Sequence, residues 1–412
     1  MKLNRRFLLE NFPLLRLAGL ALTCRFRRFG SAVACLLRRW QLLRKMLHLS
    51  GGRVVSARRQ SNGVSGVIFR ELDGAESYLR KLPETDEVEL KQLFYENRMA
   101  IYNPSGIVEI DGGRCWGHYG GYLFTGAGDI VEEVLRDYWY AAIPTPTTRC
   151  GLPPIKRMSG TVAMLTAPYG PNNYGHWLID IVPQFDLLQR AGVALAEIDY
   201  FIMHYASLPF QRETLATLGI PEEKILRASS RLHIQSDRML GTTACCGPGA
   251  SAVRKSGVGY VRRLFGTPTG SSPGSRRLYI SRLDAKSRRL MNEEQLIAAL
   301  RPLGFECLSL TGVSIRETAA LFQDAEWILG PTGSGLVNVM FGRQGGTLTE
   351  LFSSGWVNFF HWILCDHIEY RYSGLRAAGR KVSRGEEMRY LLDDFEIAPQ
   401  RVVQFLHKIG LS

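Results

Sequence analysis

The sequence predicts an α/β protein made of two Rossmann-like halves with a cleft between them, preceded by a basic amphipathic N-terminal tail. After residue 276, strand-like and helix-like segments alternate every 10–15 residues, which indicates βαβ units and a parallel sheet. A similar alternation begins near Gly160. The stretch between them, Gly266–Ser275, reads GTPTGSSPGS and is typical of a linker. We therefore expect a tail at residues 1–60, an N-terminal α/β domain at 61–265 and a C-terminal α/β domain with terminal helices at 276–412.

The composition indicates a globular chain whose charge is concentrated at one end. The 412 residues are 45% hydrophobic and 22% charged, which excludes a disordered or collagen-like protein. Residues 1–60 hold 14 Lys and Arg but only one acidic residue, Glu10, and they account for the whole net charge of +13. The rest of the chain is neutral. A nucleic-acid-binding domain carries its positive charge on a folded face, so we expect no nucleic-acid partner.

The tail has the pattern of a helix that lies on a membrane surface. Pro13 and Arg16 interrupt its apolar stretch, so neither a signal peptide nor a membrane-spanning helix is predicted. Over residues 33–48, apolar positions such as Trp40 recur at helical spacing, while Lys45 and other polar positions fall on the opposite face. This arrangement suits an anionic leaflet. We expect a cytoplasmic protein bound to the inner face of the cell membrane; a disordered extension or a misassigned start is the alternative.

The eight cysteines are scattered and indicate reduced thiols. No Cys-x-x-Cys pair is present, and the spacing fits neither a zinc site nor a disulfide framework. Cys307 and Cys365 lie in apolar contexts, where we expect core thiols of a cytosolic protein.

The order of the elements follows from apolar periodicity and turn residues. Short strands are predicted between Val67 and about Tyr140. In the first half we then expect a strand at 161–168, a helix at 173–190, a strand at 200–204, a helix at 207–218 and strands at 224–229 and 232–240. In the second half we expect strands at 278–283, 305–310, 326–331 and 346–352, with helices that begin at Asn292, Ser314 and about Ser334. Gln295 and Glu317 predict capping boxes for the first two of these helices.

The first candidate site motif is NNYGHWLIDIVPQFDLL at residues 172–188. On a helix, His176, Asp180 and Gln184 share one face. A histidine one turn from a carboxylate is a candidate general base or a ligand pair for a sugar or phosphate, and a histidine satisfied inside the core is the alternative. Pro183 predicts a kink or a later helix start. A second stripe should face the core: Trp177, Ile181, Phe185 and Leu188.

The second motif is GPTGSGLVNVMFG at residues 330–342. Gly333, Ser334 and Gly335 lie where a buried strand passes into a helix, and the free N–H groups of such a turn favour an anion such as a diphosphate. The segment lacks the Gly-Lys-Ser/Thr of a P-loop and has Asn338 at the third glycine position of a dinucleotide fingerprint. A plain tight turn is the alternative.

Two charged residues and one absence complete the candidate site. Arg282 follows a predicted strand, where a guanidinium suits bidentate phosphate contact, unless it is a surface arginine. Glu350 is a carboxylate in an apolar run that could accept from ribose hydroxyls, unless it faces an edge. No Asp-x-Asp, HExxH or clustered His/Cys motif occurs, so we expect no metal and no cofactor.

Three blocks resemble the signature segments of the family 61 glycosyltransferases: NYGHWLIDIVPQFDLL, LYISRLDA and GPTGSGLVNVMFGRQGGTLTELF. The resemblance covers residues 155–365 and implies a GT-B-like fold, a nucleotide-sugar donor, inverting chemistry and no required metal. It assigns His176 and Asp180 to the catalytic block. It assigns donor binding to Arg282, Gly333, Ser334, Gly335, Asn338 and Glu350. One departure is Thr332, where family members often carry histidine.

Together these features predict an inverting, metal-independent glycosyltransferase. The expected donor is a nucleotide sugar, and the expected acceptor is a glycan or lipid-linked glycan of surface polysaccharide synthesis. The tail at residues 1–60 would hold the enzyme at an anionic membrane. Because of Thr332, the alternative is a non-catalytic subunit that binds nucleotide sugar or polysaccharide in an assembly or export complex.

Overall fold

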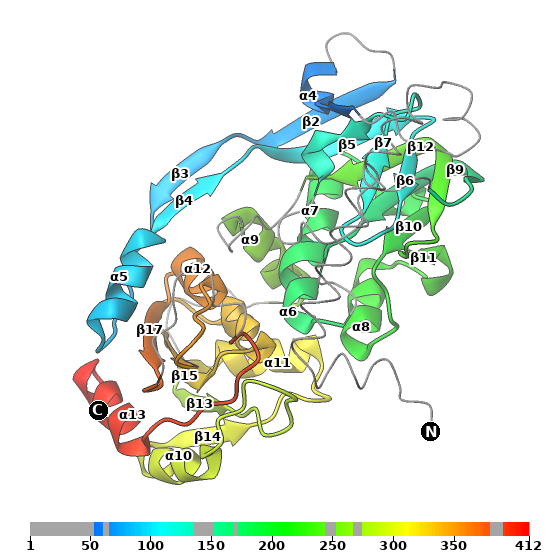
Figure 1. Ribbon diagram of the computed structural model, residues 1–412. Helices are drawn as coiled ribbons and strands as arrows, with labels where there is room; N and C mark the ends of the chain where they lie inside the picture. Colours follow the sequence, from blue (N-terminus) through cyan, green and yellow to red (C-terminus); the bar gives the residue numbers. More distant parts are fainter. Residues whose placement is uncertain are drawn as a thin grey trace, which may run out of the picture.

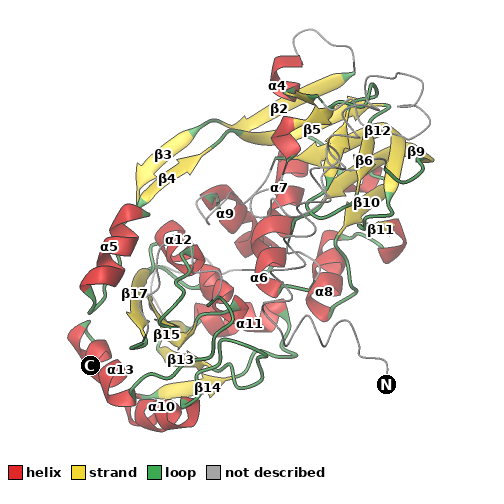
Figure 2. Ribbon diagram, in the orientation of Figure 1, coloured by secondary structure: helices red, strands yellow, loops and turns green. Residues whose placement is uncertain are grey.

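The structure is a computed structural model that describes residues 53–60, 66–135, 152–168, 172–243, 253–266, 274–379 and 390–411. It is a mixed α/β protein with two main sheets, each of which is covered by helices (Figures 1 and 2). The predicted amphipathic helix at residues 33–48 lies outside the described residues. Residues 53–60, which we assigned to the tail, carry a strand that joins the N-terminal sheet, because Val54 and Val55 pair with Ile130 and Val131.

Among the described residues, the N-terminal half forms a mixed ten-stranded sheet. The long strands β9 and β12 lie side by side at its centre, in parallel. The path through the sheet is β1 (Val54–Val55), β8 (Ile130–Val131), β7 (Tyr122–Phe124), β6 (Arg114–Trp116), β12 (His233–Thr242), β9 (Lys156–Leu165), β10 (Tyr200–Met203) and β11 (Ile225–Arg227); β5 (Ser105–Asp111) pairs with β12, and β2 (Val67–Asp73) with β5.

The two helices predicted for this half are present, whereas those at residues 57–60 and 255–264 were not predicted. The described helical segments are α4 (Ala57–Gln60), η1 (Glu132–Val134), α6 (Tyr174–His176), η2 (Trp177–Ile181), α7 (Val182–Arg190), η3 (Leu195–Glu197), α8 (Pro209–Leu218), η4 (Glu222–Lys224) and α9 (Lys255–Leu264).

The described part of the C-terminal half is a parallel sheet, as the alternation of strands and helices predicts. Its five strands run in the order β14 (Phe305–Leu308), β13 (Arg276–Ile280), β15 (Ala325–Pro331), β16 (Thr347–Phe352) and β17 (Arg371–Arg376), and every neighbouring pair is parallel. The helices are α10 (Glu293–Leu300), η6 (Arg301–Leu303), α11 (Ile315–Gln323), η7 (Ser334–Phe341), α12 (Phe360–His367) and α13 (Pro399–Lys408).

One of the two predicted capping boxes is confirmed. The Ser314 hydroxyl accepts from the Glu317 N–H at 3.2 Å, and the Glu317 carboxylate accepts from the Ser314 N–H at 3.0 Å. Asn292 does stand at the start of α10, but its side chain makes no capping bond. Its amide is instead hydrogen-bonded to both main-chain groups of Ile397, so the predicted box with Gln295 is wrong.

A hairpin and a helix form an arm, residues 76–102, that connects the two sheets. Strands β3 (Glu76–Leu79) and β4 (Met99–Tyr102) pair only with each other and leave the N-terminal sheet, and α5 (Val88–Glu96) lies at their tip beside the C-terminal sheet (Figure 1). Sequence analysis predicted only short strands here. The helix buries two residues, Leu90 and Phe94, and a nine-residue helix gives too short a pattern to separate from strands.

The arm is tied to the C-terminal half by ion pairs and by a buried aromatic ring. The main chain of Glu84 forms a parallel β-bridge with Ser373 of β17. Arg376 donates to the carboxylate of Glu87 at 2.8 Å. The Phe94 ring meets Trp362 of α12 edge-on, with ring centroids 5.0 Å apart. The arm therefore ties strand β17 and helix α12 to the N-terminal sheet.

The core also crosses between the two halves. One hydrophobic cluster contains Phe185 and Leu240 of the N-terminal half together with Ile328 and Val337 of the C-terminal half. The two sheets therefore share packed surface, and the described residues do not form two independent domains separated by an open cleft throughout. Of the described cysteines, Cys115 and Cys365 are buried free thiols, but Cys307 is exposed, so its predicted place in the core is wrong.

Candidate functional site

The histidine block begins the first helix after β9 and contains a π-helical turn. Asn173 caps α6, because its side-chain oxygen accepts the His176 N–H at 3.2 Å. The next turn, η2, is π-helical and ends at Ile181, two residues before Pro183, which has no N–H to continue the α-helical ladder. Single π-turns inside helices recur at functional sites. The irregularity predicted from Pro183 is thus a π-turn that contains Asp180.

His176 and Asp180 form the hydrogen-bonded pair that their spacing predicts. His176 Nδ1 lies 2.6 Å from Asp180 Oδ2. The other oxygen, Asp180 Oδ1, is buried and has no hydrogen-bond partner in the structure. Gln184, the third residue of this face, donates to the Asp180 main-chain oxygen at 2.6 Å. The predicted core stripe on the opposite face is fully buried: Trp177, Ile181, Phe185 and Leu188.

The glycine-rich turn follows β15 as predicted, but it leads into a 3-10 helix rather than an α-helix. The helix η7 begins at Ser334, and the side chain of Asn338 donates to the Gly335 carbonyl at 2.8 Å. The first N–H groups of any such helix have no partner within it, so they can face an anion.

Arg282 lies directly on this turn. A Cβ atom at Gly333 would come within 1.9 Å of Arg282 Nη1, so any other residue there would displace the guanidinium from this position. Arg282 Nη2 donates to the Ser287 carbonyl at 2.9 Å, which fixes the side chain. Burial lowers the pKa of Arg282 from its usual value. The structure therefore places Arg282 against the glycine-rich turn, although the two are about fifty residues apart in the sequence. The guanidinium brings a positive charge to the turn.

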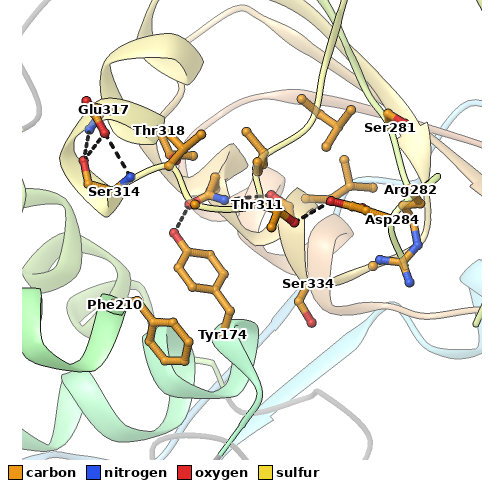
Figure 3. Close-up of a pocket in the computed structure, with 18 of the residues that line it drawn as sticks. Tyr174, Phe210, Ser281, Arg282, Asp284, Thr311, Ser314, Glu317, Thr318 and Ser334 are labelled. Carbon is orange, nitrogen blue, oxygen red and sulfur yellow. Dashed lines mark hydrogen bonds between the residues drawn. The ribbon is translucent and has the colours of Figure 1, made fainter. Parts of the chain in front are cut away.

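Two hydrogen bonds join the histidine block to the glycine-rich turn. The Ser334 hydroxyl donates to Asn173 Oδ1 at 3.1 Å, and the Tyr174 hydroxyl donates to Asn338 Oδ1 at 2.6 Å. Figure 3 shows Tyr174 reaching from the N-terminal half into the C-terminal half, with Phe210 beside it. Asn173, which contacts the predicted donor-binding turn through Ser334, thus lies one helical turn before His176.

A cavity of about 540 Å³ opens at the carboxyl end of the parallel sheet, between the two halves (Figure 3). We call it the central cavity. Its volume lies within the usual range for small-molecule sites. Ligands bind open α/β sheets at this edge. Its lining includes Tyr174 and Phe210 on one side and Arg282, Asp284 and Gly333–Gly335 on the other.

Sequence analysis did not identify several of the residues that line the central cavity. Asp284 accepts from the Ser309 hydroxyl at 2.9 Å and from the Thr311 hydroxyl, so it holds the loop that follows β14. Glu213 of α8 accepts two main-chain N–H groups at the start of α11, the nearer at 2.7 Å from Ile315. Tyr174 and Asp284 lie inside the quoted motifs, but no periodicity separates them from their neighbours. Glu213 comes from a helix with no motif.

Glu350 does not line the central cavity. It is fully buried, and its two oxygens accept from His361 Nδ1 at 2.9 Å and from the Tyr372 hydroxyl at 2.7 Å. Burial, with the Glu350 charge as a second cause, raises the pKa of Tyr372 well above its usual value. Glu350 therefore ties β16 to α12 and β17, and its carboxylate is already occupied by protein donors.

Thr332, which stands where family members often carry histidine, is also buried. Its N–H donates to the Leu351 carbonyl at 2.9 Å, and only 1% of the residue is exposed. The hydroxyl oxygen has no hydrogen-bond partner in the structure. The departure thus places a small, unsatisfied hydroxyl beside the turn that carries Gly333.

Among the described residues, no group of three His, Cys, Asp or Glu side chains is arranged to hold a metal ion. No helix there is long and apolar enough to span a membrane.

His176 and Asp180 are not among the residues that line the central cavity. A parallel-sheet half with an arginine over a glycine-rich turn, hydrogen-bonded to the segment that carries this pair, is consistent with a glycosyltransferase. Residues 174–349 match the family model described as Glycosyltransferase 61. This segment, which is less than half of the chain, is therefore similar to the glycosyltransferases of family 61. The matched segment contains every predicted site residue except Glu350, which follows it directly. No curated protein matches the chain.

Proposed function

We propose that the protein is an inverting, metal-independent glycosyltransferase whose nucleotide-sugar donor binds in the central cavity. The observation that carries this proposal is Arg282, held over Gly333 at the carboxyl edge of a parallel sheet. A guanidinium and the free N–H groups of Ser334 and Gly335 are suited to a diphosphate without a metal ion. The nucleoside would lie deeper in the cavity, near Tyr174 and Asp284.

We assign the role of general base to His176, with Asp180 as the group that orients it. The contact between Nδ1 and the carboxylate fixes the imidazole ring and favours the tautomer in which Nε2 accepts a proton. The His176 side chain is also more exposed than that of Asp180, at 21% against 11%. Sequence spacing left both residues open as the base; the arrangement of the two side chains favours histidine.

In the proposed reaction, an acceptor hydroxyl attacks the anomeric carbon of the sugar from the side opposite the diphosphate. The new bond joins the acceptor oxygen to that carbon, and the bond from the carbon to the phosphate oxygen breaks with its electron pair on the leaving group. The hydroxyl proton passes to His176 Nε2. Arg282 and the N–H groups of the turn stabilise the charge on the departing nucleoside diphosphate. The product has the opposite anomeric configuration.

The acceptor in this proposal is a glycan or lipid-linked glycan of surface polysaccharide synthesis. Attachment of the basic segment at residues 1–60 to the inner face of the cell membrane would place the enzyme beside such an acceptor. The donor sugar is hexosyl or pentosyl in this proposal.

The experiment is release of nucleoside diphosphate from a panel of nucleotide sugars, with and without oligosaccharide acceptors, in the presence of EDTA. We expect acceptor-dependent release in EDTA and an inverted anomeric centre by NMR. Arg282→Ala should weaken binding of the nucleoside diphosphate by about 1.5–3 kcal/mol, because one charge-assisted contact is lost. Activity that vanishes in EDTA and returns with Mn²⁺ or Mg²⁺ would contradict metal independence.

The buried, unsatisfied Thr332 hydroxyl supports a second candidate, a non-catalytic subunit that binds nucleotide sugar or polysaccharide. Such a subunit would bind nucleoside diphosphate at the same cavity but release none from any donor. The same panel therefore distinguishes the two functions.

A further inference from the structure

Arg282 and Arg288 are two arginines of one loop, and in the described part of the chain neither guanidinium is hydrogen-bonded to a carboxylate. Arg282 donates to the carbonyls of Ser287 and Arg288, and Arg288 Nη1 donates to the Leu391 carbonyl at 3.4 Å. Across the described part of the chain, neither guanidinium forms an ion pair. Their neighbour Arg289 behaves differently, since its Nη2 and Nε both donate to Asp394 Oδ2, at 2.6 Å and 3.0 Å.

Both groups are held at an energetic cost. Burial lowers the pKa of Arg282 and, together with the nearby charge of Arg282, lowers that of Arg288 to about 10. Arg288 Nε is buried and has no hydrogen-bond partner in the structure. The charges of Asp284, Glu293 and Asp394 favour the Arg282 cation, and the charge of Glu350 favours the Arg288 cation. For both arginines burial outweighs these charges, so holding the two guanidiniums here destabilises the fold.

The backbone at Arg288 adds a second, independent cost. Its φ angle is 54°, in the left-handed region that favours glycine. Such strain in a residue that is not glycine clusters at ligand-binding and active sites. The conformation is fixed by the surroundings, since the Arg288 carbonyl accepts from Arg282 and its N–H donates to the Leu392 carbonyl. The guanidinium carbon lies 5.5 Å from the centre of the Trp356 ring.

The position of Arg288 follows from its neighbours. Arg282 lines the central cavity, whereas Arg288 lies outside that lining, toward Trp356. The segment that carries Trp356 continues into Phe360, whose ring meets the His176 imidazole edge-on at 5.8 Å. Arg288 and His176 thus both contact the short segment at residues 356–360.

We propose that Arg288 binds the sugar-side phosphate of a diphosphate donor, next to Arg282, and that this pair of cations selects diphosphate-linked over monophosphate-linked donors. The inference rests on the proposed function and deepens it. The two guanidiniums balance the two negative charges of a sugar-linked diphosphate, whereas a sugar-linked monophosphate carries one. Glu350 supports Arg288 at a distance through its charge, because its own oxygens are occupied by His361 and Tyr372.

The test is calorimetric titration of the full-length protein with a nucleoside diphosphate and with the matching monophosphate, using the best-bound base of a panel. Arg288→Met removes the charge but keeps the aliphatic stem over Trp356. We expect it to weaken diphosphate binding by about 10- to 100-fold and monophosphate binding by less than threefold. Arg282→Met should weaken both. Arg288→Lys should recover part of the diphosphate affinity. Lys286→Met is the matched control, since Lys286 is exposed on the same loop and carries the same charge; it should change neither affinity.

A stability measurement separates binding from a structural role. Because Arg288 is strained and lacks an ion pair, Arg288→Met should melt at the wild-type temperature or higher, and Arg288→Gly, which also relieves the φ strain, higher still. Diphosphate binding by Arg288→Met at wild-type affinity would overturn the proposal, and so would an equal loss for both nucleotides or a fall in melting temperature that Arg288→Lys restores. If the wild type binds no nucleoside diphosphate at all, the proposed function itself fails.

Discussion

At the residue scale, the candidate site consists of short contacts that join distant segments of the chain. Asn173 connects His176 to Ser334, and Gly333 leaves room for Arg282. Helical spacing predicted the contact between His176 and Asp180, because it is local. The loop conformation that places Arg288 beside Arg282 could not be predicted, since left-handed backbone at an arginine has no sequence signature. The Tyr174–Asn338 bond likewise depends on how the two halves pack.

His176→Ala should lower kcat by about 10²- to 10⁴-fold with little change in donor affinity, because it removes the base but leaves Arg282 and the glycine-rich turn intact. Asp180→Asn should also lower kcat, since the amide can donate to Nδ1 and thereby favour the wrong imidazole tautomer. Initial rates at saturating donor give kcat for both variants. His407→Ala on the surface helix α13 is the control. Full activity in His176→Ala would remove His176 from the reaction.

At the element scale, the parallel sheet of the C-terminal half followed from strands and helices that alternate along the chain. The arm did not follow, because its pairing and its contacts are all with remote residues. Its helix α5 is amphipathic over only nine residues, and the β17 and α12 surface that it covers is assembled from the far end of the sequence. The glycine-rich turn was predicted correctly in place, but the helix that follows it was not predicted as a 3-10 helix.

Phe94→Ala should lower the free energy of unfolding by about 3–5 kcal/mol, because it leaves a cavity where a fully buried ring meets Trp362. Val88→Ala on the same helix is the control, since Val88 is 86% exposed and should change stability by less than about 0.5 kcal/mol. Urea denaturation gives both values. Equal effects from the two substitutions would show that the arm does not pack on the C-terminal half.

The contact between the arm and α12 should also make stability depend on pH. Burial lowers the pKa of His367 from its usual 6.5; the ring lies 3.4 Å from the hydroxyls of both Tyr78 and Tyr102. As the pH falls, His367 takes up a proton in the unfolded chain before it does so in the folded protein. The contribution of neutral His367 to the free energy of unfolding is therefore complete above pH 6.5. It falls as the pH drops from 6.5 toward the folded-state pKa.

Melting temperatures between pH 7.5 and pH 5 measure this dependence. His367→Gln should melt at a lower temperature at pH 7.5, because buried contacts are lost, but its melting temperature should change less with pH than that of the wild type. An equally steep decline in the variant would assign the pH dependence to other groups.

At the scale of the whole molecule, the sequence predicted two α/β halves, and the structure adds that they share a hydrophobic cluster and are joined by the arm. In our account the two parts of the chain have different roles. The neutral body binds the donor in its cavity, and the basic segment at residues 1–60 binds the membrane. Residues 53–60 belong structurally to the body, since Ala57 is fully buried and Ser56 donates to Glu133 at 2.6 Å.

Deletion of residues 1–52 should therefore abolish sedimentation with anionic vesicles while leaving nucleoside diphosphate binding intact. The full-length protein should lose much of its vesicle binding as salt rises from 50 to about 500 mM, because the attraction of basic residues to an anionic surface is screened. Neutral vesicles are the control. Sedimentation of the shortened protein with anionic vesicles would place the membrane contact elsewhere.

The most direct measurement of the central claim is a crystal structure of the protein with a bound nucleoside diphosphate. We predict the nucleoside in the central cavity near Tyr174 and the diphosphate against Arg282 and the N–H groups of Ser334 and Gly335, with its terminal phosphate turned toward His176. Soaks of crystals of Arg282→Ala at the same concentration should show an empty cavity. A diphosphate bound away from the glycine-rich turn, or bound equally well without Arg282, would contradict the account.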